Sequence, residues 1–282
     1  MAKTIKKRGR ALLYVPLAFV LFVVMVFLLL LTPPVQSFIA SKATVWLRDS
    51  YGLDISIGYV ALKPMQRVEL KEVRWNDYTG DTLAYLKRVE IDMFYMEQDS
   101  FKLSLQADQI ILDRPVFKLR KYPGDTISNL LMALAPFSSS EADTTPGKDF
   151  ELLCNNVLLH NGRFLWNDSH SVVLPFGVDW NHILVSDLRG DFSGVKILND
   201  SVNAYLNHFS LKEQSGFTLD TLSGQAIYSN TVTQVEGMTI VTPVSRLAGR
   251  LRFSYADVTD YADFNHAVSM KGVLDSSFLN MQ

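Results

Sequence analysis

The order of apolar and polar positions divides the chain into three parts. Residues 11–31 are 21 consecutive positions without a charge. Residues 35–50 carry apolar side chains at helical spacing, and from residue 53 onwards apolar and polar residues alternate. A period near 3.6 predicts an amphipathic helix, and a period of two predicts strands with one apolar face. The sequence therefore predicts a mainly β protein that follows two N-terminal helices.

The uncharged stretch 11–31 is predicted to be a transmembrane helix. At about 1.5 Å per residue it is about 31 Å long, which matches the thickness of a bilayer core. The basic residues that precede it, in a predicted cytoplasmic tail 1–10, are Lys3, Lys6, Lys7, Arg8 and Arg10. Such residues stay in the cytoplasm, so the body is expected on the other side of the membrane. A cleaved signal peptide is the alternative, but it has a shorter apolar region and a small-residue cleavage site.

The stretch 35–50 is predicted to form an amphipathic helix that ends at Gly52. Its apolar positions are Phe38, Ile39, Ala43, Trp46 and Leu47. Trp46 fits either a membrane interface or the core of the body. We favour a helix that caps the core. A glycine directly after the last turn is a common way for a helix to end.

The alternating pattern predicts an elongated antiparallel meander. It is divided into a first segment 53–137, a polar loop 138–148 and a second segment 149–282. The apolar phase changes between Leu70 and Val73, which predicts a β-bulge near Lys71-Glu72. At least six further strands are expected between residues 182 and 255, and a last one within 267–280. Because that strand ends the chain abruptly, we expect the sheet to continue in a longer protein.

Two local signals interrupt the meander. An apolar stripe at helical spacing predicts one further short helix over 126–135, capped by Asp125 or Thr126. Asn161-Gly162, between two alternating runs, predicts a tight hairpin.

Charge and cysteine content exclude several classes of protein. The net charge is −2, and the first ten residues carry +5, which leaves −7 for residues 11–282. A mildly acidic body without a basic stripe argues against nucleic-acid binding. The single cysteine, Cys154, excludes an internal disulfide.

The sequence contains no arrangement typical of catalysis. The five histidines are scattered without a metal-binding spacing. The stretch 190–194 departs from the G-x-S-x-G pattern of a nucleophile elbow. Asp168, Asp187 and Asp191 are possible calcium ligands, but isolated turn aspartates are more common than such sites. We therefore expect no enzyme, no cofactor and no metal, and we disfavour a hydrolase built on a lectin-like sandwich.

The apolar face of the strands must be covered. Periodicity alone favours a sandwich or a closed barrel, in which protein covers it. An open, curved sheet covered by an elongated apolar ligand is the alternative.

Several phrases of the sequence resemble the AsmA-like family, particularly its TamB branch. They are YGLDISIGYVALKPMQRVELKEVRW, TLAYLKRVEIDM, ADQIILDRPVFKLRKY, VLLHNGRFLWND and MTIVTPVSRLAGRLRFSY. The resemblance implies a bacterial inner-membrane anchor and a periplasmic body made of a curled, taco-like β-groove. It implies transport of phospholipid towards the outer membrane, and no catalytic residues. It also associates the branch with an outer-membrane barrel partner, through a C-terminal region that this sequence lacks.

From these expectations we predict which residues line the groove, and we consider two functions. By the period of two, one face of the first strand carries Leu53, Ile55 and Ile57, and one face of a later strand carries Val89, Ile91 and Met93. Both are predicted to line the groove near the membrane. The first function is phospholipid transport. The alternative is a scaffold for assembly or secretion of outer-membrane proteins, in which a sheet edge pairs with client strands.

Overall fold

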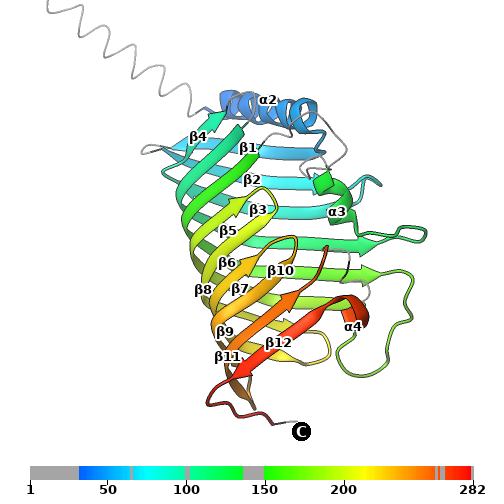
Figure 1. Ribbon diagram of the computed structural model, residues 1–282. Helices are drawn as coiled ribbons and strands as arrows, with labels where there is room; N and C mark the ends of the chain where they lie inside the picture. The colour runs from blue at the N-terminus through cyan, green and yellow to red at the C-terminus, as the bar shows by residue number, and fades with distance from the viewer. Residues whose placement is uncertain are drawn as a thin grey trace, which may run out of the picture.

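The computed structural model describes residues 32–63, 66–98, 102–135, 149–257, 260 and 264–280. The predicted transmembrane segment 11–31 and the predicted loop 138–148 lie outside these residues. None of the helices in the described part is long and apolar enough to cross a membrane. The described part is mainly β, as predicted, and forms one long curled sheet (Figure 1).

The described elements begin with helix α2 (Pro33–Tyr51). The strands are β1 (Ile55–Lys63), β2 (Arg67–Asn76), β3 (Thr82–Asp92), β4 (Tyr95–Gln98), β5 (Lys102–Lys121), β6 (Asp149–Asp168), β7 (His182–Leu198), β8 (Ser201–Glu213), β9 (Thr218–Tyr228), β10 (Val232–Val241), β11 (Arg246–Ser254) and β12 (Ser269–Leu274). Two short helices, α3 (Asn129–Leu134) and α4 (Phe264–Ala267), lie between strands. Five strands, β7 to β11, occupy residues 182–255, where at least six were predicted, because register shifts break the alternation inside β7 and β8.

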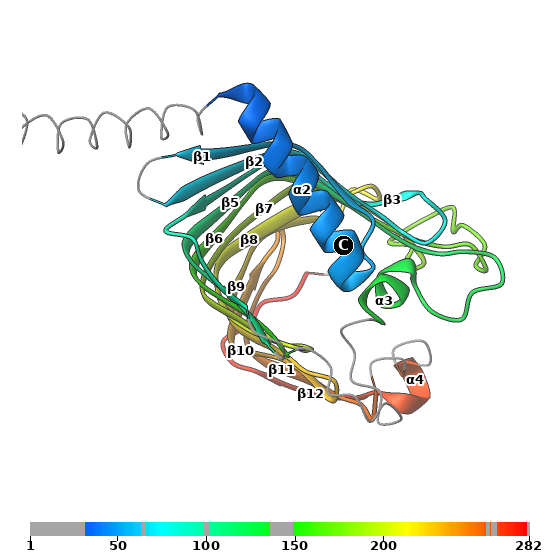
Figure 2. The same cartoon turned by 90° about the horizontal axis from the view of Figure 1, so that it is seen from above.

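The strands follow one another along the sheet in chain order, with β4 paired at the side of β5. In the described residues β1 and β12 are the two ends of this path, so the sheet is open. The sandwich or barrel favoured by periodicity is therefore wrong, because period two reports an apolar face but not what covers it. Figure 2 shows that the strands are bent, so that the sheet curls and leaves one side open.

One pair of strands contradicts the predicted antiparallel meander. Strands β5 and β6 are parallel, from Lys102 beside Asp149 to Lys121 beside Asp168. The other paired strands in the described part are antiparallel. A parallel pair needs a connection that brings the chain back to the starting end of the first strand. Here residues 122–148, which include α3, make that connection, and alternation within each strand cannot reveal it.

Residues with left-handed backbone conformation mark a bend that recurs from strand to strand. Glu72, Arg114, Asn161 and Asp187 have φ between 51° and 54°. They lie at or next to corresponding positions of β2, β5, β6 and β7. Such a conformation is unfavourable for residues other than glycine. Pairing with the neighbouring strands must therefore hold these residues in it. We call this line the crease. It divides the sheet into a first arm, which contains β5 residues 102–113, and a second arm, which contains β5 residues 115–121.

Two predictions for residues at the crease are wrong. The bulge near Lys71-Glu72 is absent, because Tyr59 pairs with Lys71 and Ile57 with Val73, so neither strand has an extra residue. The phase change comes instead from the left-handed Glu72. The hairpin at Asn161-Gly162 is also wrong, since β6 continues through these two residues without reversing. A type I′ turn needs two left-handed residues, and here Asn161 alone has positive φ.

Helix α2 lies across the end of the curl beside β1 (Figure 2). It ends as predicted at Gly52, which is left-handed (φ 66°) and donates its backbone N–H to the Arg48 carbonyl. Thr44 Oγ1 accepts a hydrogen bond from the Ile57 backbone N–H at 3.3 Å. The helix therefore covers part of the free edge of β1.

The two short helices differ from prediction. Helix α3 is shorter than the predicted 126–135, and its cap is Ser128 rather than Asp125 or Thr126. The Ser128 hydroxyl accepts from the Leu131 backbone N–H. Helix α4 contradicts the prediction of only one further helix. Its four residues are too few for a helical period to show in the sequence.

Candidate functional site

The inner face of the curled sheet carries a continuous apolar row. Residues paired directly across neighbouring strands lie on the same face of a sheet. One such row crosses ten strands, from β1 to β11 with β4 left aside. Its members are Val60, Leu70, Val89, Leu112, Leu159, Gly190, Phe209, Leu222, Ile240 and Leu247. Gly190 alone lacks a side chain, and the ring of Phe192 occupies the space that a Cβ there would need.

A second row in the first arm runs parallel to it. Its members are Leu62, Val68, Ile91, Ile110, Val157, Phe192 and Leu206. Ile91, Ile110, Val157 and Phe192 also contact a buried cluster that includes Ala107 and Cys154. The inner face of the first arm is therefore apolar over most of its width.

The second arm contributes a third row to the same face. Ile55, Trp75, Ala84, Phe117, Phe164 and Val185 are paired in turn across β1 to β7. Val185 and Leu159 belong to one buried cluster, which Phe164 and Phe209 contact. Because Leu159 is a member of the first row, the rows of both arms lie on one inner face.

The structure places the six predicted lining residues in three different settings. Val89 and Ile91 lie on the inner face in the first arm, and Ile55 and Ile57 lie on it in the second arm. Leu53, just before β1, is buried. Met93 lies in the turn after β3, with positive φ and 55 % exposure. Alternation cannot place Met93, because the strand has already ended there.

Helix α2 and both arms meet in a cluster at the end of the curl. Leu53 and Leu103 form its buried centre, and Trp46 and Leu47 of α2 pack against them. Ile55 and Trp75 from the second arm, and Leu105 and Phe150 from the first, complete it. We call this group the end cluster. Trp46 packs on protein here, and the inner face beside β1 is filled by side chains.

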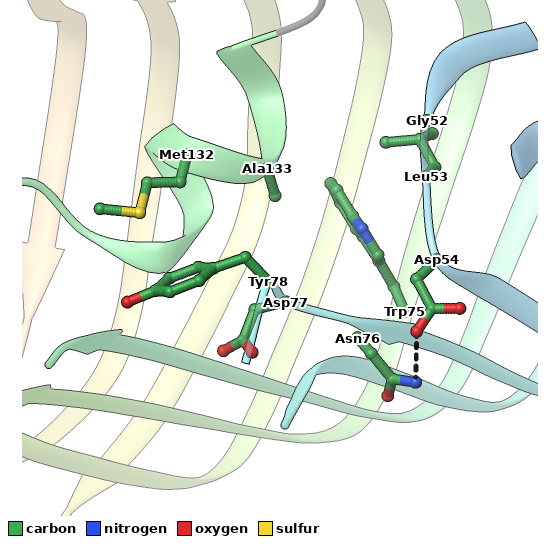
Figure 3. A pocket seen from close by; sticks show the side chains of 9 residues that line it. All are labelled: Gly52, Leu53, Asp54, Trp75, Asn76, Asp77, Tyr78, Met132 and Ala133. Carbon is green, nitrogen blue, oxygen red and sulfur yellow. Dashed lines mark hydrogen bonds between the residues drawn. The ribbon is translucent and has the colours of Figure 1, made fainter. Parts of the chain in front are cut away.

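A small cleft lies where α2, the β2–β3 turn and α3 meet (Figure 3). Its volume is about 160 Å³. The carboxylates in its lining already have partners. Asp54 accepts from the Asn76 amide at 3.0 Å and lies 3.6 Å from Arg48. Asp54 is therefore held by neighbouring side chains at the edge of this cleft.

Asp77, also in this cleft, belongs to a buried polar network that fixes α3. Its carboxylate accepts hydrogen bonds from the Asn129 amide at 2.8 Å and the Tyr122 hydroxyl at 2.8 Å. Thr79 donates to it from both its hydroxyl and its backbone N–H. Burial alone would raise the pKa of Asp77, but these hydrogen bonds outweigh it and hold the pKa below its ordinary value of 3.8.

Asn129 connects α3 to β5. This side chain is fully buried, and its amide also donates to the Lys118 carbonyl at 3.2 Å, while its Oδ1 accepts from the Arg120 backbone N–H at 2.8 Å. Phe117 is the last residue of β5 that pairs with β3. Asn129 therefore hydrogen-bonds to the β5 backbone just beyond the end of that pairing.

The three aspartates considered as calcium ligands have separate partners. Asp168 accepts from His170, Asp187 pairs with Lys212 at 2.9 Å, and Asp191 accepts from the Asn207 amide. Among the described residues, no group of histidine, cysteine and acidic side chains is placed to hold a metal ion. Ser193, the serine of the stretch 190–194, donates to Asn207 rather than to a histidine.

Most of the inner-face row was not predicted as lining. Ile110, Leu112, Val157 and Leu159 follow the alternating pattern of the sequence, but their common face depends on how β5 pairs with β6. Comparison with models of known protein families gives no match for this chain. Comparison with curated proteins gives none either.

Proposed function

We propose that this chain is a membrane-anchored periplasmic module of the AsmA-like type, TamB branch, which carries phospholipid acyl chains along the inner face of its sheet. The observation that supports it best is the apolar row that crosses ten strands without a charged side chain. This is a binding function and needs no catalytic group or cofactor.

The physical basis is the cost of exposing an acyl chain to water. Each methylene group costs about 0.8 kcal/mol when it leaves an apolar environment. A lipid crossing an aqueous compartment unaided would pay this for both of its chains. A continuous apolar face keeps that cost small at every position along the path, because one apolar contact replaces another.

The anchor and the location belong to the same proposal. The uncharged stretch 11–31 is a transmembrane helix, and the basic residues before it hold the N-terminus in the cytoplasm. Helix α2 begins at Pro33, directly after this stretch. The body then stands in the periplasm with α2 and β1 closest to the bacterial inner membrane.

The alternative function is a scaffold for outer-membrane protein assembly or secretion, with a barrel protein as partner. The difference between the two edge strands of the sheet supports this alternative. At one edge α2 covers β1, whereas all six residues of β12 at the other edge are exposed. A free edge strand pairs readily with another extended chain. In that case the edge of β12, rather than the inner face, carries the function.

Site-specific photocrosslinking in cells distinguishes these functions. A photoreactive residue at Val157, on the inner face, should capture phospholipid. The matched control is His160 on the same strand, which is exposed and lies in the charged row of Arg88 and Asp113. Equal lipid capture from both positions, or capture of protein alone from Val157, would contradict lipid carriage. Capture of a partner protein from Val273 on β12 would support the scaffold function.

A further inference from the structure

The outer face of the second arm carries a cleft whose basic residues lack acidic partners. The cleft has a volume of about 210 Å³ and is lined by Arg74, Thr82, Tyr85, Val116 and Lys118. Arg74 pairs with Tyr85, and Tyr85 with Val116, so these three form one row across β2, β3 and β5. Trp75, next to Arg74, belongs to the end cluster inside the curl. Because successive side chains alternate between faces, the row of Arg74 lies on the outer face.

A third basic residue extends this surface onto β6. Arg163 pairs with Val116 and is exposed. In the same way Lys118 pairs with Leu165, and Leu165 with Leu184, which is 43 % exposed. On β6, Arg163 and Leu165 therefore lie beside Val116 and Lys118 of the cleft, and Leu184 of β7 lies beyond Leu165.

The absence of acidic partners here contrasts with the rest of this end of the sheet. Lys63 and Lys71 pair with Glu69, Arg67 pairs with Asp92, and Arg88 lies beside Glu90 and Asp113. Within the described residues, neither Arg74 nor Lys118 forms an ion pair with a carboxylate. Glu72, two residues before Arg74 on β2, accepts a hydrogen bond from the Tyr85 hydroxyl.

We propose that this outer cleft binds the phosphate of a phospholipid headgroup at the membrane surface. Arginine and lysine together suit a phosphate, because the guanidinium donates two parallel hydrogen bonds and the ammonium adds a point charge. The Thr82 hydroxyl adds a neutral donor. The leucines beside the cleft suit the apolar boundary beneath a headgroup.

A headgroup is favoured over free phosphate by the position of the cleft. Strands β2 and β3 follow directly after β1, which α2 covers. With the proposed anchor preceding α2, this end of the sheet is the end nearest to the bilayer. The inference rests on the proposed membrane attachment, but not on lipid carriage by the inner face. Headgroup binding here would hold the body in one orientation on the membrane.

The test uses the full chain in a neutral detergent and a probe without acyl chains, so the inner face takes no part. The probe is glycerophosphoglycerol, the deacylated headgroup of phosphatidylglycerol, titrated by ³¹P NMR. Replacing both cations, Arg74→Gln with Lys118→Gln, should weaken its binding about ten-fold or more, because charge-assisted hydrogen bonds to the phosphate are lost. The control is Arg250→Gln with Lys271→Gln, two exposed cations on β11 and β12, which should bind like the wild type.

Three outcomes overturn the proposal. They are no binding of the probe by the wild type, equal weakening in both double variants, and inorganic phosphate binding as tightly as the headgroup. Circular dichroism and thermal melting verify that each variant folds. Lipid capture at Val157 is measured separately, so the proposal for the outer cleft and the proposal for the inner face are tested independently.

Discussion

At the scale of single residues, Ile55 decides how the inner face behaves beside α2. It is half-buried and packs against the end cluster, rather than lying along an open part of the sheet. An aspartate at this position would lose water without gaining a partner, which destabilises a folded protein by several kcal/mol.

We therefore expect Ile55→Asp to lower the free energy of unfolding by about 3 kcal/mol. Denaturant unfolding followed by tryptophan fluorescence measures this, since Trp46 and Trp75 belong to the same cluster. The control Ser56→Asp places the carboxylate on the exposed outer side of the same strand and should change stability by less than about 0.5 kcal/mol. Equal stability of the two variants would show that the end cluster is open to water.

The lowered pKa of Asp77 predicts how the stability of the fold depends on pH. Its pKa is lower in the folded protein than the ordinary value of 3.8. A carboxyl group of this kind stabilises the fold above its unfolded pKa, and this contribution is lost as the pH falls through the folded pKa. Asp77→Asn should therefore melt at a lower temperature than the wild type at pH 7, and the difference should shrink below about pH 4.

Thermal melting between pH 7 and pH 3 tests this dependence. The control Asp220→Asn, at an exposed position of β9, should follow the wild type across the whole range. If Asp77→Asn stays offset from the wild type by a constant amount down to pH 3, the network does not depend on the charge of this carboxylate.

At the scale of elements, β11 and β12 pair by close approach of their backbones. Gly249 has φ 149°, and a Cβ there would lie 2.0 Å from the Val273 carbonyl oxygen. Gly272, on the facing strand, has space, because a Cβ would lie 3.6 Å from the nearest Leu251 atom. The pair depends on glycine at one position and tolerates a side chain at the other.

Gly249→Ala should therefore detach β12 while Gly272→Ala leaves it in place. Hydrogen exchange measures this, because the backbone amides of 269–274 lose protection when the strand pair opens. We expect exchange at least ten-fold faster in Gly249→Ala, and the other strands should keep their protection. Protection in β12 that stays as in the wild type would contradict the close approach at Gly249.

At the scale of the whole molecule, the proposed topology depends on the basic residues before the anchor. A reporter that is active only in the periplasm, fused after Gln282, should be active in cells. Replacing Lys3, Lys6, Lys7, Arg8 and Arg10 with glutamate should reduce that activity, because the charges that hold the N-terminus in the cytoplasm are gone. Activity from a cytoplasmic reporter at Gln282 would contradict the location.

Local patterns predicted the elements better than their arrangement. Helix α2, its glycine C-cap and the strands follow from spacing along the chain, because each depends on neighbours within a few residues. The parallel pairing of β5 with β6 involves residues 47 positions apart, such as Lys102 and Asp149, and no local period reports it. The inner-face row depends on that pairing, so it could not be assembled from the sequence.

The Asn161-Gly162 signal shows the same limit at one position. Asparagine indicated a left-handed residue, and Asn161 is left-handed. Whether the chain then reverses or merely bends depends on the strands on either side. Here β5 and β7 hold β6 in the sheet beyond residue 162, and the chain bends.

Because the bend at the crease recurs from strand to strand, the length of the curled sheet can be calculated from its number of strands. Strands with a similar bend can be added side by side without changing the cross-section of the curl. Ten steps separate β1 from β12 along the sheet, and at about 4.8 Å per step this is roughly 48 Å. Each inserted hairpin would extend the apolar path by about 10 Å and leave the existing pairs untouched. The number of strands, rather than the length of any one of them, then sets the distance that the inner face can bridge.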